Sequence, residues 1–149
     1  MSLADMALSL ALAGVLAALA IVDLRQKRLP DALTLPLIAA GLVFAWAEGR
    51  LADGLIGAAL GYGVFWLIGE LHFRRHGTEG LGLGDAKLFA AAGAWLGWAA
   101  LPFVLLIAAM GGLGAAALRG TGRGTALAFG PWLALGFAVV WVATRLGLF

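Results

Sequence analysis

The strongest constraint on the fold is an uncharged run of 31 residues, 88–118, in the second half of the chain. As a single helix this run would measure about 46 Å, whereas the hydrocarbon core of a bilayer is about 30 Å thick. We therefore expect two membrane-spanning helices, at 86–98 and 101–118. The break between them is expected around residues 97–102, where Gly97 and Pro102 interrupt the run.

Composition extends this prediction to the whole chain. Of the 149 residues, 63% are hydrophobic and 12% are charged, whereas about 25% of the residues of a soluble domain are charged. Further apolar segments lie at 6–24, 32–47, 54–71 and 125–144, and a membrane span takes about 20 residues. The sequence thus predicts an all-α integral membrane protein, a bundle of six transmembrane helices that forms one domain over residues 1–149.

The basic residues predict the orientation of these helices. The first apolar segment is followed by basic residues and preceded by none, which is the reverse of a secretory signal peptide. With the N-terminus outside, eight basic residues fall on the inner side and two on the outer side, as the positive-inside rule requires. The inner ones are Arg25, Lys27, Arg28, Arg74, Arg75, Lys87, Arg119 and Arg123, and the outer ones are Arg50 and Arg145. Both termini are therefore expected outside, with a polar inner loop over 72–79.

Composition also excludes several functional classes. The chain has no cysteine, which excludes a disulfide framework, a thiolate zinc site and a cysteine nucleophile. Its two histidines, His72 and His76, flank Arg74 and Arg75 in a stretch typical of a charged rim. Topology explains the net charge of +2 better than nucleic acid binding does. We expect no metal, no cofactor and no nucleic acid partner.

Two acids lie at span ends on the same predicted side of the membrane. Asp23 ends the first span, and Asp85 follows three alternate glycines, Gly80, Gly82 and Gly84, at the start of the fourth. Each has an ordinary explanation, Asp23 as a charge at a span end and Asp85 as a helix N-cap. Acids at a membrane boundary are nevertheless candidates for function.

Together the two acids would form a site for hydrolysis. Two adjacent carboxylates with little water around them cannot both stay ionised, so one keeps a proton. The ionised member can activate water for attack on a peptide carbonyl, while the protonated member donates to the developing oxyanion. The alternative is a small transporter or channel that uses the same acids as a proton or cation site. A position near one membrane face, away from the midplane, argues against that alternative.

Four short motifs occur in order along nearly the whole chain. They are Ile21-Val22-Asp23-Leu24-Arg25, Arg28-Leu29-Pro30-Asp31, Gly82-Leu83-Gly84-Asp85-Ala86-Lys87-Leu88 and Phe129-Gly130-Pro131. Together they resemble the type IV prepilin peptidases, membrane aspartic proteases of the GxGD type. The resemblance implies that Asp23 and Asp85 are the catalytic pair.

The same resemblance implies a substrate, a location and one departure from the family. The substrates would be prepilins or pseudopilins of type IV pili, tight-adherence pili or type II secretion. Their basic leader would be removed at the cytoplasmic face of the bacterial inner membrane. Bifunctional members also N-methylate the new terminus and carry paired CxxC motifs in an N-terminal extension. This chain starts at the first span and has no cysteine, so we expect leader peptidase activity without N-methyltransferase activity.

The remaining charged residues near the inner face have two kinds of expected role. Glu70, Glu79 and Asp31 are candidate binding sites for a basic leader, or else ordinary solvated charges. Asp31 is also the expected cap of the second span. Lys87 is expected to give electrostatic support near Asp85 or to contact lipid headgroups.

Glycines are expected to serve either movement or packing. Gly82 and Gly84 are candidates for a hinge that brings Asp85 toward Asp23. Other glycines recur four residues apart and predict close contact between helices. These are Gly57, Gly61, Gly93 and Gly97.

Overall fold

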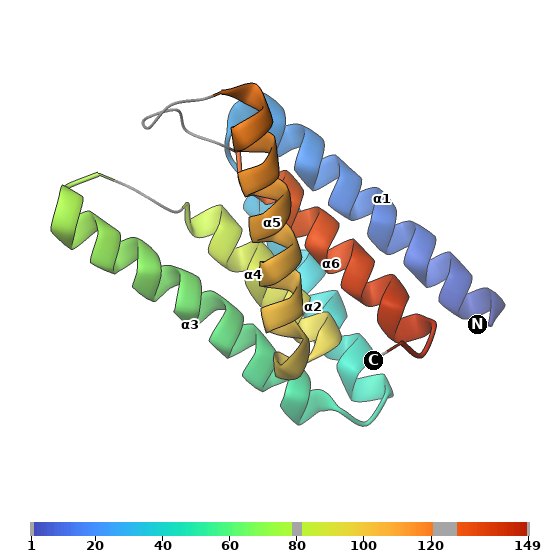
Figure 1. Cartoon of the computed structure of the whole chain (residues 1–149). Helices are drawn as coiled ribbons and strands as arrows, with labels where there is room; N and C mark the ends of the chain where they lie inside the picture. Colours follow the sequence, from blue (N-terminus) through green and yellow to red (C-terminus); the bar gives the residue numbers. More distant parts are fainter. Residues whose placement is uncertain (1, 79–81, 121–127, 149) are drawn as a thin grey trace. The chain divides into compact units, whose positions relative to one another are not determined.

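The computed structural model describes residues 2–78, 82–120 and 128–148. In these residues it contains six α-helices and one short 3₁₀ helix (Figure 1). They are α1 (Leu3–Gln26), α2 (Asp31–Ala47), α3 (Leu51–His76), α4 (Leu83–Leu96), η1 (Trp98–Ala100), α5 (Leu101–Arg119) and α6 (Gly130–Arg145). The all-α prediction and the predicted break between the fourth and fifth helices are confirmed. Glu79, Gly80, Arg123 and residues 125–127 lie outside the described residues.

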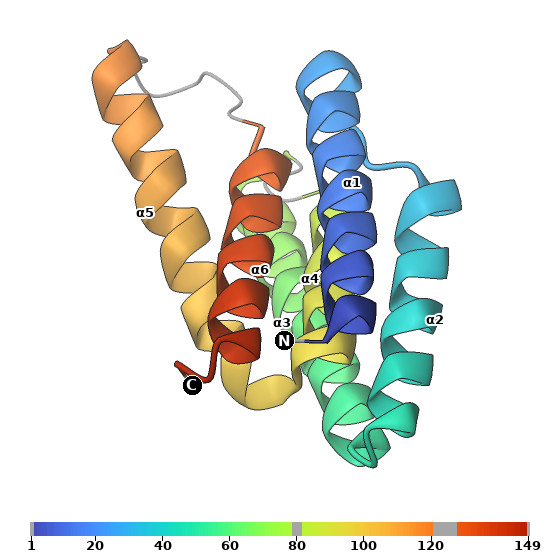
Figure 2. The same ribbon diagram turned by 90° about the vertical axis from the view of Figure 1, so that its right-hand side faces the viewer.

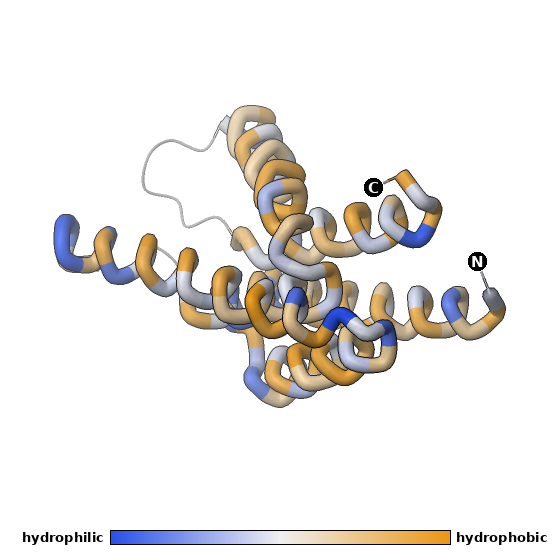
Figure 3. The backbone as a smooth tube through the Cα atoms, turned by 90° about the horizontal axis from the view of Figure 1, so that it is seen from below, coloured by the Kyte–Doolittle hydropathy of each residue, from blue (hydrophilic) through white to orange (hydrophobic). Residues whose placement is uncertain are grey.

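Three stretches of the described chain are long and apolar enough to cross a membrane: Leu3–Gln26, Leu51–His76 and Trp98–Arg119. α2 is apolar but shorter, with 17 residues, and α4 and α6 have 14 and 16. Large apolar side chains such as Leu10 and Leu113 are exposed, while the end of α3 is hydrophilic (Figure 3). Such an apolar exterior fits contact with lipid. The chain is a membrane protein.

The chain divides into two compact units, which are described separately. The first comprises Met1–Lys27 and Pro102–Phe149, and contains α1, α6 and most of α5. The second is Arg28–Leu101, and contains α2, α3 and α4 side by side (Figure 2).

In the second unit the backbones of α3 and α4 are almost in contact. A Cβ atom built on Gly57 would lie 2.8 Å from the carbonyl carbon of Gly93, and one built on Gly61 would lie 2.9 Å from that of Phe89. Phe65, one turn beyond Gly61, stacks on Phe89 with ring centroids 4.5 Å apart. The small-residue motifs of the two helices therefore pack against each other, as predicted for Gly57, Gly61 and Gly93.

α2 packs along α4 through Trp95. The indole N–H of Trp95 donates to the carbonyl oxygen of Leu37 at 2.8 Å. Gly41 leaves room for this ring, because a Cβ there would lie 2.8 Å from Trp95 Nε1. With α2 and α3 both against it, α4 is buried along Ala86 and residues 88–95.

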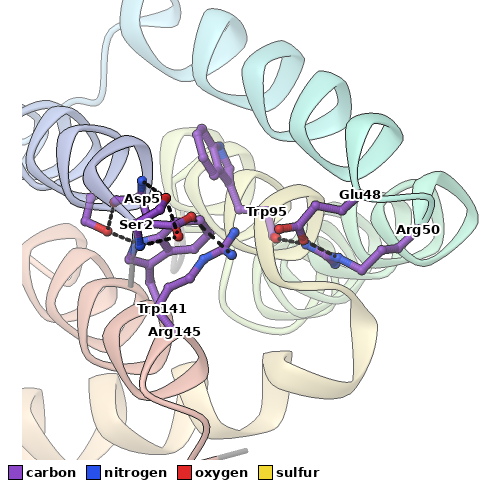
Figure 4. Close-up of polar contacts among 8 residues, drawn as sticks. Ser2, Asp5, Glu48, Arg50, Trp95, Trp141 and Arg145 are labelled. Atoms are coloured by element: carbon purple, nitrogen blue, oxygen red, sulfur yellow. Dashed lines mark hydrogen bonds and ion pairs between the residues drawn. The ribbon is translucent and has the colours of Figure 1, made fainter.

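Gly97 and Arg50 fix the end of the second unit at which α4 stops and α3 starts. Gly97 ends α4 with φ at 86°, a conformation that glycine adopts at little cost. Arg50 Nη2 donates to the carbonyl oxygen of Trp95 at 2.9 Å and Arg50 Nε pairs with Glu48 at 2.9 Å (Figure 4). The arginine thus satisfies a carbonyl group that the helix end leaves without an intrahelical partner.

In the first unit α1 and α6 lie antiparallel (Figure 1). Ser2 and Asp5 form a capping box at the start of α1, and Arg145 Nη1 lies 3.7 Å from Asp5 Oδ1. One turn further along, Trp141 Nε1 donates to Ser9 Oγ at 3.0 Å (Figure 4). The start of α1 and the end of α6 therefore lie at the same end of this unit.

Several boundaries differ from the predictions. The prediction of a loop over 72–79 is wrong for residues 72–76, because α3 continues to His76. The basic residues in the last turn of α3 interact favourably with the helix dipole. α4 begins at Leu83, three residues before the predicted start, so Asp85 lies inside the first turn and is not the N-cap. The described residues 128 and 129 are not helical, and α6 begins with Gly130 and Pro131, a favourable helix start. The predicted cap at Asp31 is also wrong, since Pro30 occupies the N-cap position.

Replacing Gly57 by alanine is expected to destabilise the protein by about 1–3 kcal/mol, because the new methyl group would overlap the backbone of α4. Thermal unfolding in detergent, followed by helical circular dichroism, measures this. Gly63→Ala is the matched control on the same helix, because a Cβ there has no atom of the described residues within 4 Å. It is expected to keep or slightly raise stability. Equal losses in the two variants would contradict the close α3–α4 contact.

Candidate functional site

Asp23 lies on the buried face of α1. The buried residues of this helix are Leu12, Leu16, Leu19 and Asp23, spaced by three or four residues so that they share one face. The aspartate continues an otherwise apolar stripe, and it is 6% exposed. Its Oδ2 atom is buried without a hydrogen-bond partner among the described residues. A carboxylate in such a position is costly, which favours a functional role over a simple charge at a span end.

The first turn of α6 packs directly against this carboxylate. A Cβ atom built on Gly130 would lie 2.8 Å from Asp23 Cγ and 3.3 Å from Asp23 Cβ. Only glycine leaves space here, so Gly130 is required by the position of the aspartate. The start of a helix carries a partial positive charge, which favours a carboxylate beside it.

Asp85 is half-buried in the first turn of α4. The N-cap of this helix is Gly82, which has an extended backbone conformation and provides no side-chain cap. The next glycine, Gly84, packs closely on the chain before α2, since a Cβ there would lie 2.8 Å from Leu29 Cβ and 3.3 Å from the Leu29 nitrogen. Among the described residues, the atom nearest to a Cβ on Gly82 would be Gly84 N, at 3.9 Å, so the two motif glycines have different described surroundings.

Lys87 and Asp31 form an ion pair within the second unit. Lys87 Nζ donates to Asp31 Oδ1, so the start of α4 is joined to the start of α2. The lysine side chain is 22% exposed and the aspartate side chain is 60% exposed. From the sequence, Asp31 is expected to bind the substrate and Lys87 to give electrostatic support. In the structure these two residues are partners.

Glu70 lies near the end of α3 and pairs with Arg74, with Glu70 Oε1 and Arg74 Nε 2.9 Å apart. His72 and His76 stack on the same helix with ring centroids 4.5 Å apart. Among the described residues, no group of three or more His, Cys, Asp or Glu side chains forms a metal-binding cluster.

The predicted catalytic acids belong to different units, Asp23 to the first and Asp85 to the second. Their pairing stays a prediction. The contacts found within the units are Asp23 with Gly130 and Asp31 with Lys87, neither of which was predicted. A signal for the first contact was present, since Gly130 belongs to the Phe129-Gly130-Pro131 motif.

Comparison with known proteins gives a consistent result. The profile of the type IV leader peptidase family matches residues 10–117. A protein of Escherichia coli named prepilin leader peptidase/N-methyltransferase is 50% identical over 123 residues, which cover 79% of this chain and 55% of that protein. Proteins of the same name from Aeromonas hydrophila and Dickeya chrysanthemi are each 45% identical, over 89% and 90% of this chain and 49% and 50% of their own lengths. The chain thus spans about half the length of these relatives. No solved structure matches it significantly.

Replacing Gly130 by alanine is expected to destabilise the protein by about 1–3 kcal/mol, because the methyl group would overlap the buried Asp23 carboxylate. In the double variant Gly130→Ala/Asp23→Ala the loss should be smaller than the sum of the single effects, since the overlapping carboxylate is gone. Chemical or thermal unfolding in detergent measures both.

The matched control is Gly114→Ala, in α5 of the same unit, where no atom in the described part of the chain lies within 4 Å of a built Cβ. It should not destabilise. Strictly additive effects of Gly130→Ala and Asp23→Ala would show that the two residues are not in contact.

Proposed function

Because this chain belongs to the type IV leader peptidase family, we propose that it removes the leader peptide from prepilins or pseudopilins, with Asp23 and Asp85 as its catalytic pair. The observation that carries the proposal is the buried Asp23 carboxylate, 6% exposed and packed on Gly130 of a second motif. Asp85, in the first turn of α4, supplies the other carboxyl group.

The proposed chemistry needs only these two side chains and water. One carboxylate takes a proton from the attacking water, and the other, protonated, donates to the carbonyl oxygen as the tetrahedral intermediate forms. The proton is then delivered to the leaving amine, which completes cleavage of the peptide bond. Burial of Asp23 limits access of bulk water to the reacting groups.

We further propose that all six helices lie in the bacterial inner membrane, with both termini periplasmic and the acids at the cytoplasmic end. The antiparallel course of α1 and α6 (Figure 1) supports termini on one side. α4, with 14 residues, is short for a span, but its burial between α2 and α3 means that little of it would need to contact lipid.

N-methylation of the new terminus is proposed to be absent from this chain. The support is the lack of cysteine, since the bifunctional members that the sequence resembles carry paired CxxC motifs. No metal or other cofactor enters the proposed reaction.

Glu70 and Glu79 are the proposed binding sites for the basic leader. Glu70 already pairs with Arg74, so a leader would have to exchange with this partner. Asp31, the third acid expected near the inner face, pairs with Lys87 of its own unit and is left out of the proposed binding site. Gly82 remains the better candidate for a hinge, because Gly84 packs on Leu29.

Substitution of either catalytic acid, Asp23→Asn or Asp85→Asn, is expected to lower cleavage about 10²–10⁴-fold. The assay follows a substrate with a basic leader, a glycine and an apolar helix in liposomes, with membrane insertion checked for each variant. Asp53→Asn, an acid at the far end of the second unit, is the matched control and should cleave normally. Cleavage by a well-inserted Asp23→Asn or Asp85→Asn variant would refute the aspartic mechanism.

The proposed absence of methyl transfer is tested by incubating the wild type and its substrate with labelled S-adenosylmethionine. Formation of labelled product would refute it.

Removal of the Glu70 charge by Glu70→Gln is expected to weaken substrate binding about two- to fivefold at low ionic strength and less at high salt, where charges are screened. The KM for the same substrate at two salt concentrations measures this. Glu48→Gln, which removes an ion-paired acid from the connection between α2 and the start of α3, should have no such effect. A salt-independent change in Glu70→Gln would count against leader binding there.

A further inference from the structure

The first turn of α4 is weak when considered by itself. Its N-cap, Gly82, has no side-chain hydrogen bond to the turn, and its first backbone bonds, from the amides of Asp85 and Ala86 to the Gly82 carbonyl, are long at 3.2 and 3.4 Å. Glycine at Gly84 further lowers helix stability. A helix start with these features unravels easily, yet it carries Asp85.

Among the contacts described for this turn, two reach outside the helix and hold it in place. Gly84 packs on Leu29, and Lys87, three residues further along the same face, pairs with Asp31. Leu29 is 8% exposed, so the packing contact is well buried. Both partners come from the short segment 29–31 that leads into α2.

We propose that Asp31 and Lys87 are positioning residues: with the packing of Gly84 on Leu29, their ion pair fixes the first turn of α4 and thereby the Asp85 carboxylate. This inference rests on the proposed function only for the role of Asp85. The proposed hydrolytic chemistry uses neither the segment 29–31 nor Lys87. Positioning of Asp85 is the role that both would share. It also differs from the two roles expected from the sequence, leader binding by Asp31 and headgroup contact by Lys87.

An exposed ion pair contributes little to global stability, so the effect is expected to be local. Breaking the pair should loosen the first turn of α4 and leave the buried helix 86–96 folded. A small displacement of a catalytic group is enough to slow a reaction strongly, whereas binding of a substrate elsewhere is unaffected. The expected result is a lower kcat with an unchanged KM.

The first experiment measures the mobility of α4 directly. Because the chain has no cysteine, Leu83→Cys gives a single attachment point for a spin label at an exposed residue of the first turn, 55% exposed. In liposomes, Lys87→Met and Asp31→Asn should each raise label mobility. The exchanged pair Asp31→Lys/Lys87→Asp should restore it, because the ion pair forms with reversed polarity.

The control is Arg75→Met, which removes an exposed positive charge from the end of α3 and should leave label mobility unchanged. Unchanged mobility in Lys87→Met would overturn the proposal. So would an exchanged pair as mobile as the single variants, because the two charges would then act separately, on lipid or on the leader.

The second experiment measures cleavage by the same variants without the label. Each single variant should lower kcat about 10- to 100-fold with KM within about twofold, and the exchanged pair should recover most of the loss. Normal kcat in the single variants would overturn the link to Asp85. If the wild type cleaved no leader substrate, the proposed function would fail, while the label measurement would still decide whether the pair fixes α4.

Discussion

The contact between the backbones of α3 and α4 is the interaction on which the second unit depends. Helices in lipid gain little from the hydrophobic effect when they associate, so close packing of small residues has to supply the stabilisation. Gly57 against Gly93 and Gly61 against Phe89 provide it. The same contacts set how far α4 is displaced along α3, and therefore the position of Asp85 relative to α3, one turn before Phe89. A packing interaction thus determines where a proposed catalytic group lies.

The two acids have different environments, and the difference follows from the helices that carry them. Asp23 is in the last turn of a long helix and continues its buried stripe, so the protein must make room for it by placing glycine at Gly130. Asp85 is in the first turn of a short helix and is half-buried. Burial of one carboxyl group and partial exposure of the other fit a reaction in which water must enter but remain limited.

The sequence predicts the helices well because long uncharged runs in a membrane protein have few alternatives to helix. Their ends are less predictable, since hydropathy marks the edge of the membrane and not the end of the helix. α3 continues through charged residues to His76 and stops at Gly77, whose φ is 69°. The motifs that contain Asp23 and Asp85 led to the prediction that these two acids are the catalytic pair. The contacts Asp31 to Lys87 and Asp23 to Gly130 join residues far apart in the chain, so no local pattern predicts the pairing, although Gly130 stands in a motif of its own.

Both acids lie beside helix N-termini, Asp85 in the first turn of α4 and Asp23 against the first turn of α6. The partial positive charge of a helix start offsets part of the cost of a poorly solvated carboxylate without adding a mobile cation. Lys87, two positions from Asp85, pairs with Asp31 and by this pairing joins the start of α4 to the start of α2. A basic residue of the motif can therefore serve the geometry of the helix that carries the acid.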